Sequence, residues 1–131
     1  MNEYEQRVYD FLAFLLSTRT SILQVIEERC EQRDWREYGE GRLKVLNEAI
    51  SFLSAYLDDK NTKKDYETLH NNISTMKEKY CFLHRFLKNT ENTCFNNGQK
   101  LTAKHLHKGF CNLLQNLQWH KIFVAQNSEA N

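Results

Sequence analysis

The stretch that decides the fold of this protein is TKKDYETLHNNISTMKEKYCFLHRFL, residues 62–87. Its apolar residues alternate at spacings of three and four: Tyr66, Leu69, Ile73, Met76, Tyr80, Leu83 and Leu87. This spacing places all of them on one stripe of an α-helix. A stripe of this length must be covered by other apolar faces, so the helix needs partners from elsewhere in the chain.

Three further segments supply such faces, and helices are predicted over residues 3–38, over 42–57 and from about residue 100 onward. Their stripes include Val8, Leu12, Leu15 and Ile22 in the first helix, Leu43, Leu46, Ile50, Leu53 and Leu57 in the second, and Ala103, Leu106, Phe110, Leu113 and Leu117 in the last. Short connections make consecutive helices antiparallel. We therefore predict an all-α fold, an antiparallel up-down-up-down four-helix bundle.

Helix breakers are almost missing, because the chain has no proline and four glycines. The glycines are therefore interpreted as markers of turns between helices. Gly39 and Gly41 are expected between the first two helices, and Gly98 in a polar connection that ends near residue 100. Thr62 and Asp65 resemble a capping box at the start of the third helix. We expect a single domain over residues 1–126 and a frayed polar tail over residues 127–131.

Composition argues against several classes of function. A net charge of +1 argues against nucleic-acid binding, which requires a strongly basic surface. The longest apolar run, residues 11–16, is far shorter than the roughly 20 residues that span a bilayer. No secretory signal segment is recognisable. A cytoplasmic protein without a membrane span is the expectation, and a secreted protein is the alternative if a signal peptide has been removed.

The predicted topology gathers the four cysteines and three of the five histidines near one end of the bundle. Cys81 and His84 lie three apart on one helix, and His107 and Cys111 lie four apart on another. These four side chains have the donor types of a tetrahedral zinc site, so zinc is kept as an alternative; no other cofactor is expected. Free, buried thiols and disulfides (Cys81 with Cys111, or Cys30 with Cys94) are the other two interpretations.

The segment His105-Leu106-His107-Lys108-Gly109 resembles the core motif of histidine phosphotransfer domains, which are also four-helix bundles. The resemblance covers five residues. It implies that His105 carries a phosphoryl group, that Lys108 screens its charge, and that Gly109 leaves room for a response regulator to approach.

Motifs for nucleophilic catalysis and for phosphate binding are not recognisable, so enzyme activity is not expected. The sequence instead favours an interaction protein: an adaptor, an inhibitor or a small regulatory subunit that binds another protein. A secreted, cytokine-like bundle is the alternative, by analogy of fold alone.

Four aromatic residues are the candidate interface anchors: Trp35, Tyr38, Trp119 and Phe123. Trp35 and Tyr38 either cover the core or lie exposed. Trp119 and Phe123 are four apart and share a helix face. If the first helix does not bury them, they are expected to anchor a partner or a second copy of the chain, giving a homodimer.

Overall fold

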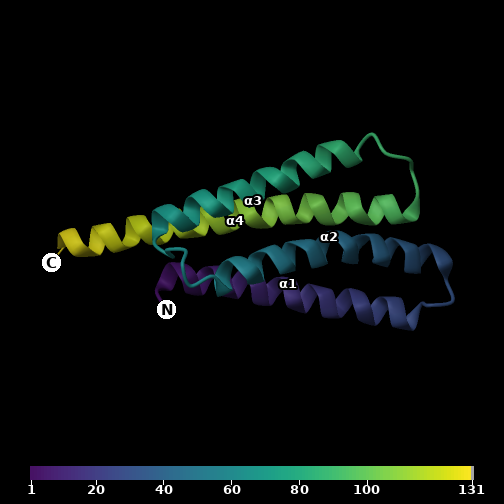
Figure 1. Ribbon diagram of the computed structural model, residues 1–131, viewed down its shortest axis with the longest axis horizontal. Coiled ribbons are helices and arrows are strands. Elements are labelled where there is room, and N and C mark those ends of the chain that lie inside the picture. Colours follow the sequence, from purple (N-terminus) through teal and green to yellow (C-terminus); the bar gives the residue numbers. More distant parts are fainter. Residues whose placement is uncertain (131) are drawn as a thin grey trace.

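The computed structural model describes the backbone of residues 1–130 and the side chains of residues 1–127. This part of the chain forms four α-helices: α1 (Glu3–Glu28), α2 (Arg33–Asp58), α3 (Tyr66–Leu87) and α4 (Cys94–Ala130). Consecutive helices run in opposite directions (Figure 1). The predicted up-down-up-down four-helix bundle is thus confirmed. Within the tail expected to fray, residues 127–131, the backbone of residues 127–130 continues α4 and residue 131 lies outside the described part, so the fraying stays a prediction.

The core is built from the stripes that the sequence predicts. Val8, Leu46, Leu53, Leu69, Ile73, Tyr80, Phe110 and Leu117 are among its fully buried side chains. Phe110 lies near the middle of the core. Its ring stacks parallel to the ring of Tyr80 at 5.7 Å between centroids, and the ring of Phe11 meets it edge-on at 5.0 Å between centroids. Each helix therefore contributes one apolar face to a common interior.

The prediction of one continuous helix over residues 3–38 is wrong, because the chain reverses at residues 29–32. Arg29 ends α1, and the Arg36 guanidinium donates to the Cys30 carbonyl across the turn. No glycine or proline marks this reversal. Residues 27–35 are all exposed, however, so a continued helix would have no apolar face to bury there. The reversal lets the stripe of α2 pack against α1.

Gly41 and Gly98 lie inside helices, not in the connections predicted for them. A Cβ atom added to Gly41 would overlap the Phe95 carbonyl oxygen of α4, and one added to Gly98 would overlap the Tyr38 carbonyl oxygen of α2. Only residues without side chains permit such backbone-to-backbone contact. The two glycines therefore mark a close crossing of α2 and α4, and α2 begins well before the predicted residue 42.

Two helix starts also differ from prediction. The cap of α3 is Asp65, whose carboxylate accepts from the Thr68 N–H at 2.9 Å, so Thr62 does not open a capping box. Helix α4 starts at Cys94, about one and a half turns before residue 100. The Thr93 hydroxyl accepts from the Asn96 N–H at 3.1 Å and caps this end.

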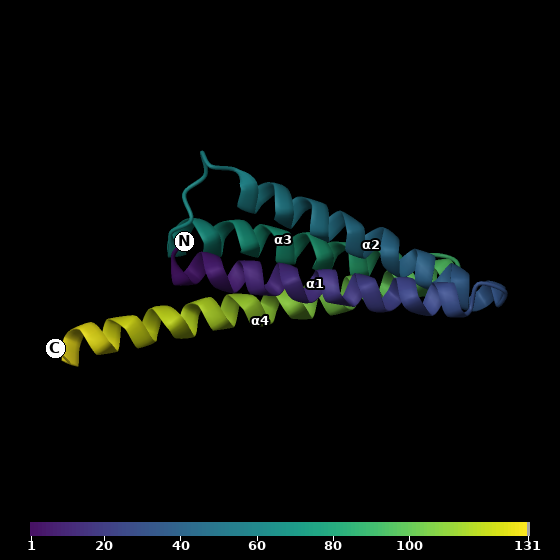
Figure 2. The same ribbon diagram turned by 90° about the horizontal axis from the view of Figure 1, so that it is seen from below.

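Pairing among the helices is uneven. The α2–α4 interface is the most extensive, followed by α3–α4 and α1–α2, whereas α1 touches α4 only sparsely and the backbones of α2 and α3 make no contact in the described chain. Helices α2 and α4 run parallel and meet near their N-termini, and they diverge toward the other end (Figure 2). Open flanks therefore remain between α2 and α3 and between α1 and α4.

Helix α4 is longer than the others, and its last turns project beyond the bundle (Figures 1 and 2). Residues 122–127 are all exposed. Across the described residues, no helix combines the length and the apolar character needed to cross a membrane.

Candidate functional site

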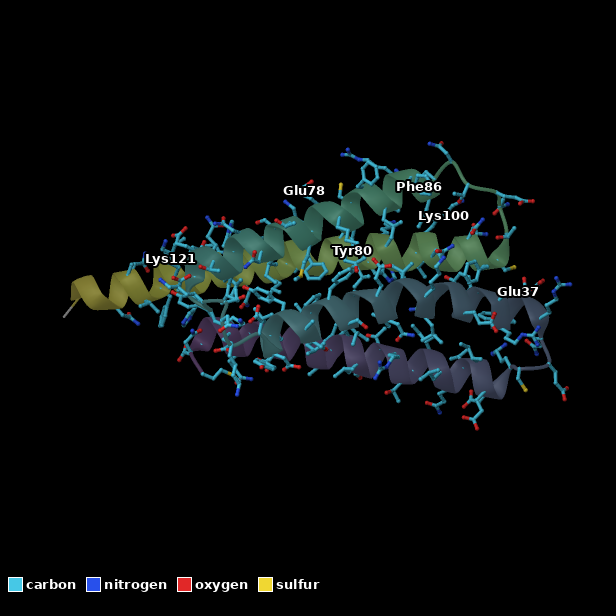
Figure 3. The ribbon with its side chains drawn as sticks, viewed as in Figure 1. Glu37, Glu78, Tyr80, Phe86, Lys100 and Lys121 are labelled. Atoms are coloured by element: carbon cyan, nitrogen blue, oxygen red, sulfur yellow. The ribbon has the colours of Figure 1, made fainter. Side chains whose placement is uncertain are left out.

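A concave apolar surface with exposed aromatic residues lies between α2 and α3, and we call it the α2–α3 groove (Phe52, Met76, Lys79, Phe82 and Phe86). It consists of two adjoining hollows of about 200 and 300 Å³, both lined by Lys79. Tyr80, which Figure 3 shows reaching from α3 toward the middle of the bundle, lines the deeper hollow. The groove exists because the backbones of α2 and α3 stay apart.

Three phenylalanines line this groove and remain largely in contact with solvent. Phe82 is 72% exposed, Phe86 is 62% exposed and Phe52 is 49% exposed. Figure 3 places Phe86 near the C-terminal end of α3. Such a concentration of exposed aromatic side chains is typical of an interaction surface, because leaving them in water costs free energy that binding recovers.

Lys79 crosses the groove from α3 to α2. Its Nζ lies 2.5 Å from Oε1 of Glu48 and 3.7 Å from the centroid of the Phe52 ring. Lys79 and Glu48 are both more than two-fifths exposed, and an ion pair this exposed contributes little to stability, about 0–1 kcal/mol. The Lys79 side chain therefore bridges the groove, and a ligand can displace it at low cost.

Trp119 and Phe123, the anchors predicted on the last helix, are 71% and 58% exposed. Helix α1 does not cover them. Instead, His120 makes the contact with α1, through Glu3 at 2.8 Å and the Tyr4 ring at 5.0 Å between centroids. Trp119 and Phe123 therefore form a second aromatic surface near the C-terminal end of α4, apart from the groove.

The other predicted pair, Trp35 and Tyr38, lies in the first turns of α2. Trp35 is exposed and its ring carries the Arg29 guanidinium at 4.7 Å, whereas Tyr38 is partly buried. Both line a shallow hollow with Cys94 of α4. Neither residue covers the core, because the α1–α2 turn places them at the end of the bundle.

The motif that resembles histidine phosphotransfer domains lies on α4, where His105 and Lys108 are exposed. Partial burial lowers the pKa of the His105 imidazole, and the charges of Arg42, Lys104 and Lys108 lower it further. The position of Gly109 does not offer the expected gap, since the Phe11 ring of α1 fills the space beside it. His105, Lys108 and Gly109 instead line a cavity between α1, α2 and α4.

The predicted zinc set is not assembled. His107 Nε2 lies 3.7 Å from Cys111 Sγ, but no cluster of three or more potential ligands occurs among the described residues. Desolvation lowers the pKa of His84 and the charge of His107 adds to this, but the four predicted ligands do not form a group that could hold a metal ion in the described part of the chain.

Neither predicted disulfide, Cys81 with Cys111 or Cys30 with Cys94, is formed in the structure, where all four cysteines are free. Cys30 is exposed in the α1–α2 turn, while Cys94 packs beside Trp35 and Tyr38. Desolvation raises the pKa of the Cys94 thiol, as do the charges of Asp34 and Glu37, so this thiol is a poor nucleophile near neutral pH.

Sequence reasoning missed Phe52, Phe82 and Phe86 as site residues. The available signal was their place outside the three-and-four stripes: the core pattern of α2 and α3 is complete without them. Large aromatic residues that a core does not need are candidates for an interface.

Comparison of the chain with protein-family models, curated proteins and solved structures found no match.

Proposed function

We propose that this protein is a non-enzymatic interaction protein, an adaptor, inhibitor or small regulatory subunit, that binds an amphipathic helix of another protein in the α2–α3 groove. The observation that carries the proposal is the exposure of Phe52, Phe82 and Phe86 along one concave surface. Helix-in-groove recognition uses this kind of surface, with apolar residues of the incoming helix as anchors.

The bridging side chain of Lys79 suggests the chemistry of the partner. A helix that enters the groove must displace Lys79 from Glu48 and Phe52. A carboxylate on the incoming helix would replace Glu48 as the partner of the ammonium group. We therefore expect a partner helix with apolar residues at spacings of three and four and an aspartate or glutamate beside that stripe.

The free thiols of all four cysteines support the cytoplasmic form of this proposal, because a reducing compartment maintains thiols in that state. Intact mass after alkylation of the non-reduced protein counts them. Four alkyl groups are expected. A protein that takes up none would instead favour the secreted, cytokine-like alternative.

Photo-crosslinking tests the groove directly. A benzoylphenylalanine replaces Phe82 in one version of the protein and the exposed Arg85 in another, and both are expressed in cells that normally contain the protein. Position 85 is the matched control, because Arg85 is an exposed residue of the same helix that does not line the groove. A discrete protein adduct is expected from position 82 and not from position 85.

The same adduct should disappear when Phe52→Ser and Phe86→Ser are added, with the melting temperature little changed because both side chains are exposed. Equal adducts from positions 82 and 85 would contradict the proposal. So would an adduct that survives the loss of the other two phenylalanines.

A further inference from the structure

A second feature, separate from the groove, is the cavity between α1, α2 and α4, which we call the α1–α4 cavity. Its volume is about 270 Å³, close to the lower end of the roughly 300–1,000 Å³ typical of small-molecule sites. Phe11, Leu15, Leu46 and Leu106 are among the residues that give it apolar walls. The cavity lies where α1 and α4 contact each other only sparsely.

Two residues that line this cavity, Arg42 and Thr102, each carry a buried polar atom without a hydrogen-bond partner among the described residues: Nε of Arg42 and Oγ1 of Thr102. Thr102 is only 5% exposed. A buried donor left unpaired costs about 1–3 kcal/mol, so both atoms favour a ligand that accepts hydrogen bonds.

Every ionisable side chain in the lining is basic. Arg42, His105 and Lys108 all line the cavity, and none of its lining residues is acidic. Arg42 and Lys108 also make no ion pair among the described residues. A ligand that suits this lining has a negatively charged end and an apolar body.

We propose that the α1–α4 cavity binds a small apolar carboxylate of the medium-chain fatty acid class. The hydrocarbon tail lies among the apolar side chains of α1, α2 and α4. The carboxylate accepts hydrogen bonds from Arg42 and Thr102, and Lys108 adds favourable charge. His105 and Lys108 thus serve ligand binding in this proposal, not phosphoryl transfer.

The first test compares three ligands with the same tail and different head groups: decanoate, decanol and decylamine. Each is titrated into the isotope-labelled full chain below its micelle-forming concentration, and amide chemical shifts are followed by NMR. Decanoate should shift amides of the cavity lining and bind at least about tenfold more tightly than decanol. Decylamine should not bind. Equal affinity for decanol, or shifts confined to the α2–α3 groove, would overturn the proposal.

The second test uses variants. Arg42→Gln should weaken decanoate binding at least about tenfold, whereas Lys104→Gln should change it less than about twofold. Lys104 is the matched control, since it is an exposed cation on α4 that does not line the cavity. Thermal melts establish that each variant is folded.

Arg42 is partly buried, so its replacement could also disturb the fold. Thr18→Phe avoids this problem, because Thr18 lines the cavity from α1 at a partly exposed position. The larger side chain should block decanoate while leaving Arg42 in place. A folded Thr18→Phe variant that binds decanoate like the wild type would overturn the proposal, whatever the result for Arg42→Gln.

Discussion

Helix α2 meets two of its neighbours in opposite ways. Toward α4 it packs backbone against backbone, at Gly41 and Gly98. Toward α3 the backbones stay apart, and side chains span the distance: Lys79 reaches Glu48, and Asn72 donates to the Tyr56 hydroxyl at 3.0 Å. The contrast shows that a close crossing on one diagonal of a four-helix bundle leaves the flanks open. The surface available for binding is thus set by residues that lack side chains.

The largest expected effect comes from breaking the close crossing. Gly41→Ala should destabilise the protein by about 2–3 kcal/mol, because its Cβ meets backbone atoms of α4 that cannot move aside. Urea denaturation measures this difference. The matched control is Gly39→Ala, also in α2, where the added Cβ meets side-chain atoms of Ile26 and Ile22 and no backbone of a facing helix. If both variants lose equal stability, the crossing is not what holds α2 against α4.

A smaller effect of opposite sign is expected at the floor of the groove. The Tyr80 hydroxyl is buried without a hydrogen-bond partner among the described residues, and desolvation raises its pKa. Tyr80→Phe removes this unpaired group and preserves stacking on Phe110, so it should stabilise the fold by about 1 kcal/mol. Thermal and urea unfolding test this result. A loss of stability would mean that the hydroxyl has a partner in solution.

The smallest effect on stability is expected near the C-terminal end of α4. Trp119→Ala with Phe123→Ala should change the free energy of unfolding by less than about 1 kcal/mol, because both side chains are exposed. Any self-association seen by light scattering should decrease in the double variant if these residues join two copies. Unfolding of the double variant would show instead that they belong to the core.

Much of the fold could be predicted because apolar spacing alone defines the stripes of α2, α3 and α4. The errors concern ends. Residues 27–35 have a composition that suits a helix, and the turn there depends on tertiary packing that no local pattern reports. Likewise, a glycine that ends a helix and one that lets two helices touch are the same letter in the sequence.

The candidate sites could be predicted less well. Trp119 and Phe123 could be singled out as candidates because, with Ile122, they give one helix more apolar surface than a single bundle covers. The groove was missed because its existence depends on the distance between α2 and α3, which follows from the crossing of α2 with α4. The α1–α4 cavity has the same origin: residues of three helices line it, and no single segment of the sequence contains its pattern.

The crossing at Gly41 and Gly98 also has a consequence for evolution of the chain. Apolar core residues of similar volume exchange at small cost, so the stripes are free to drift among leucine, isoleucine, valine and methionine. The two glycines have no such substitutes, since any Cβ overlaps backbone of the facing helix. In divergent relatives, the pair of glycines, one in the second helix and one in the first turns of the fourth, should therefore outlast the hydrophobic pattern and serve as the signature by which those relatives are recognised.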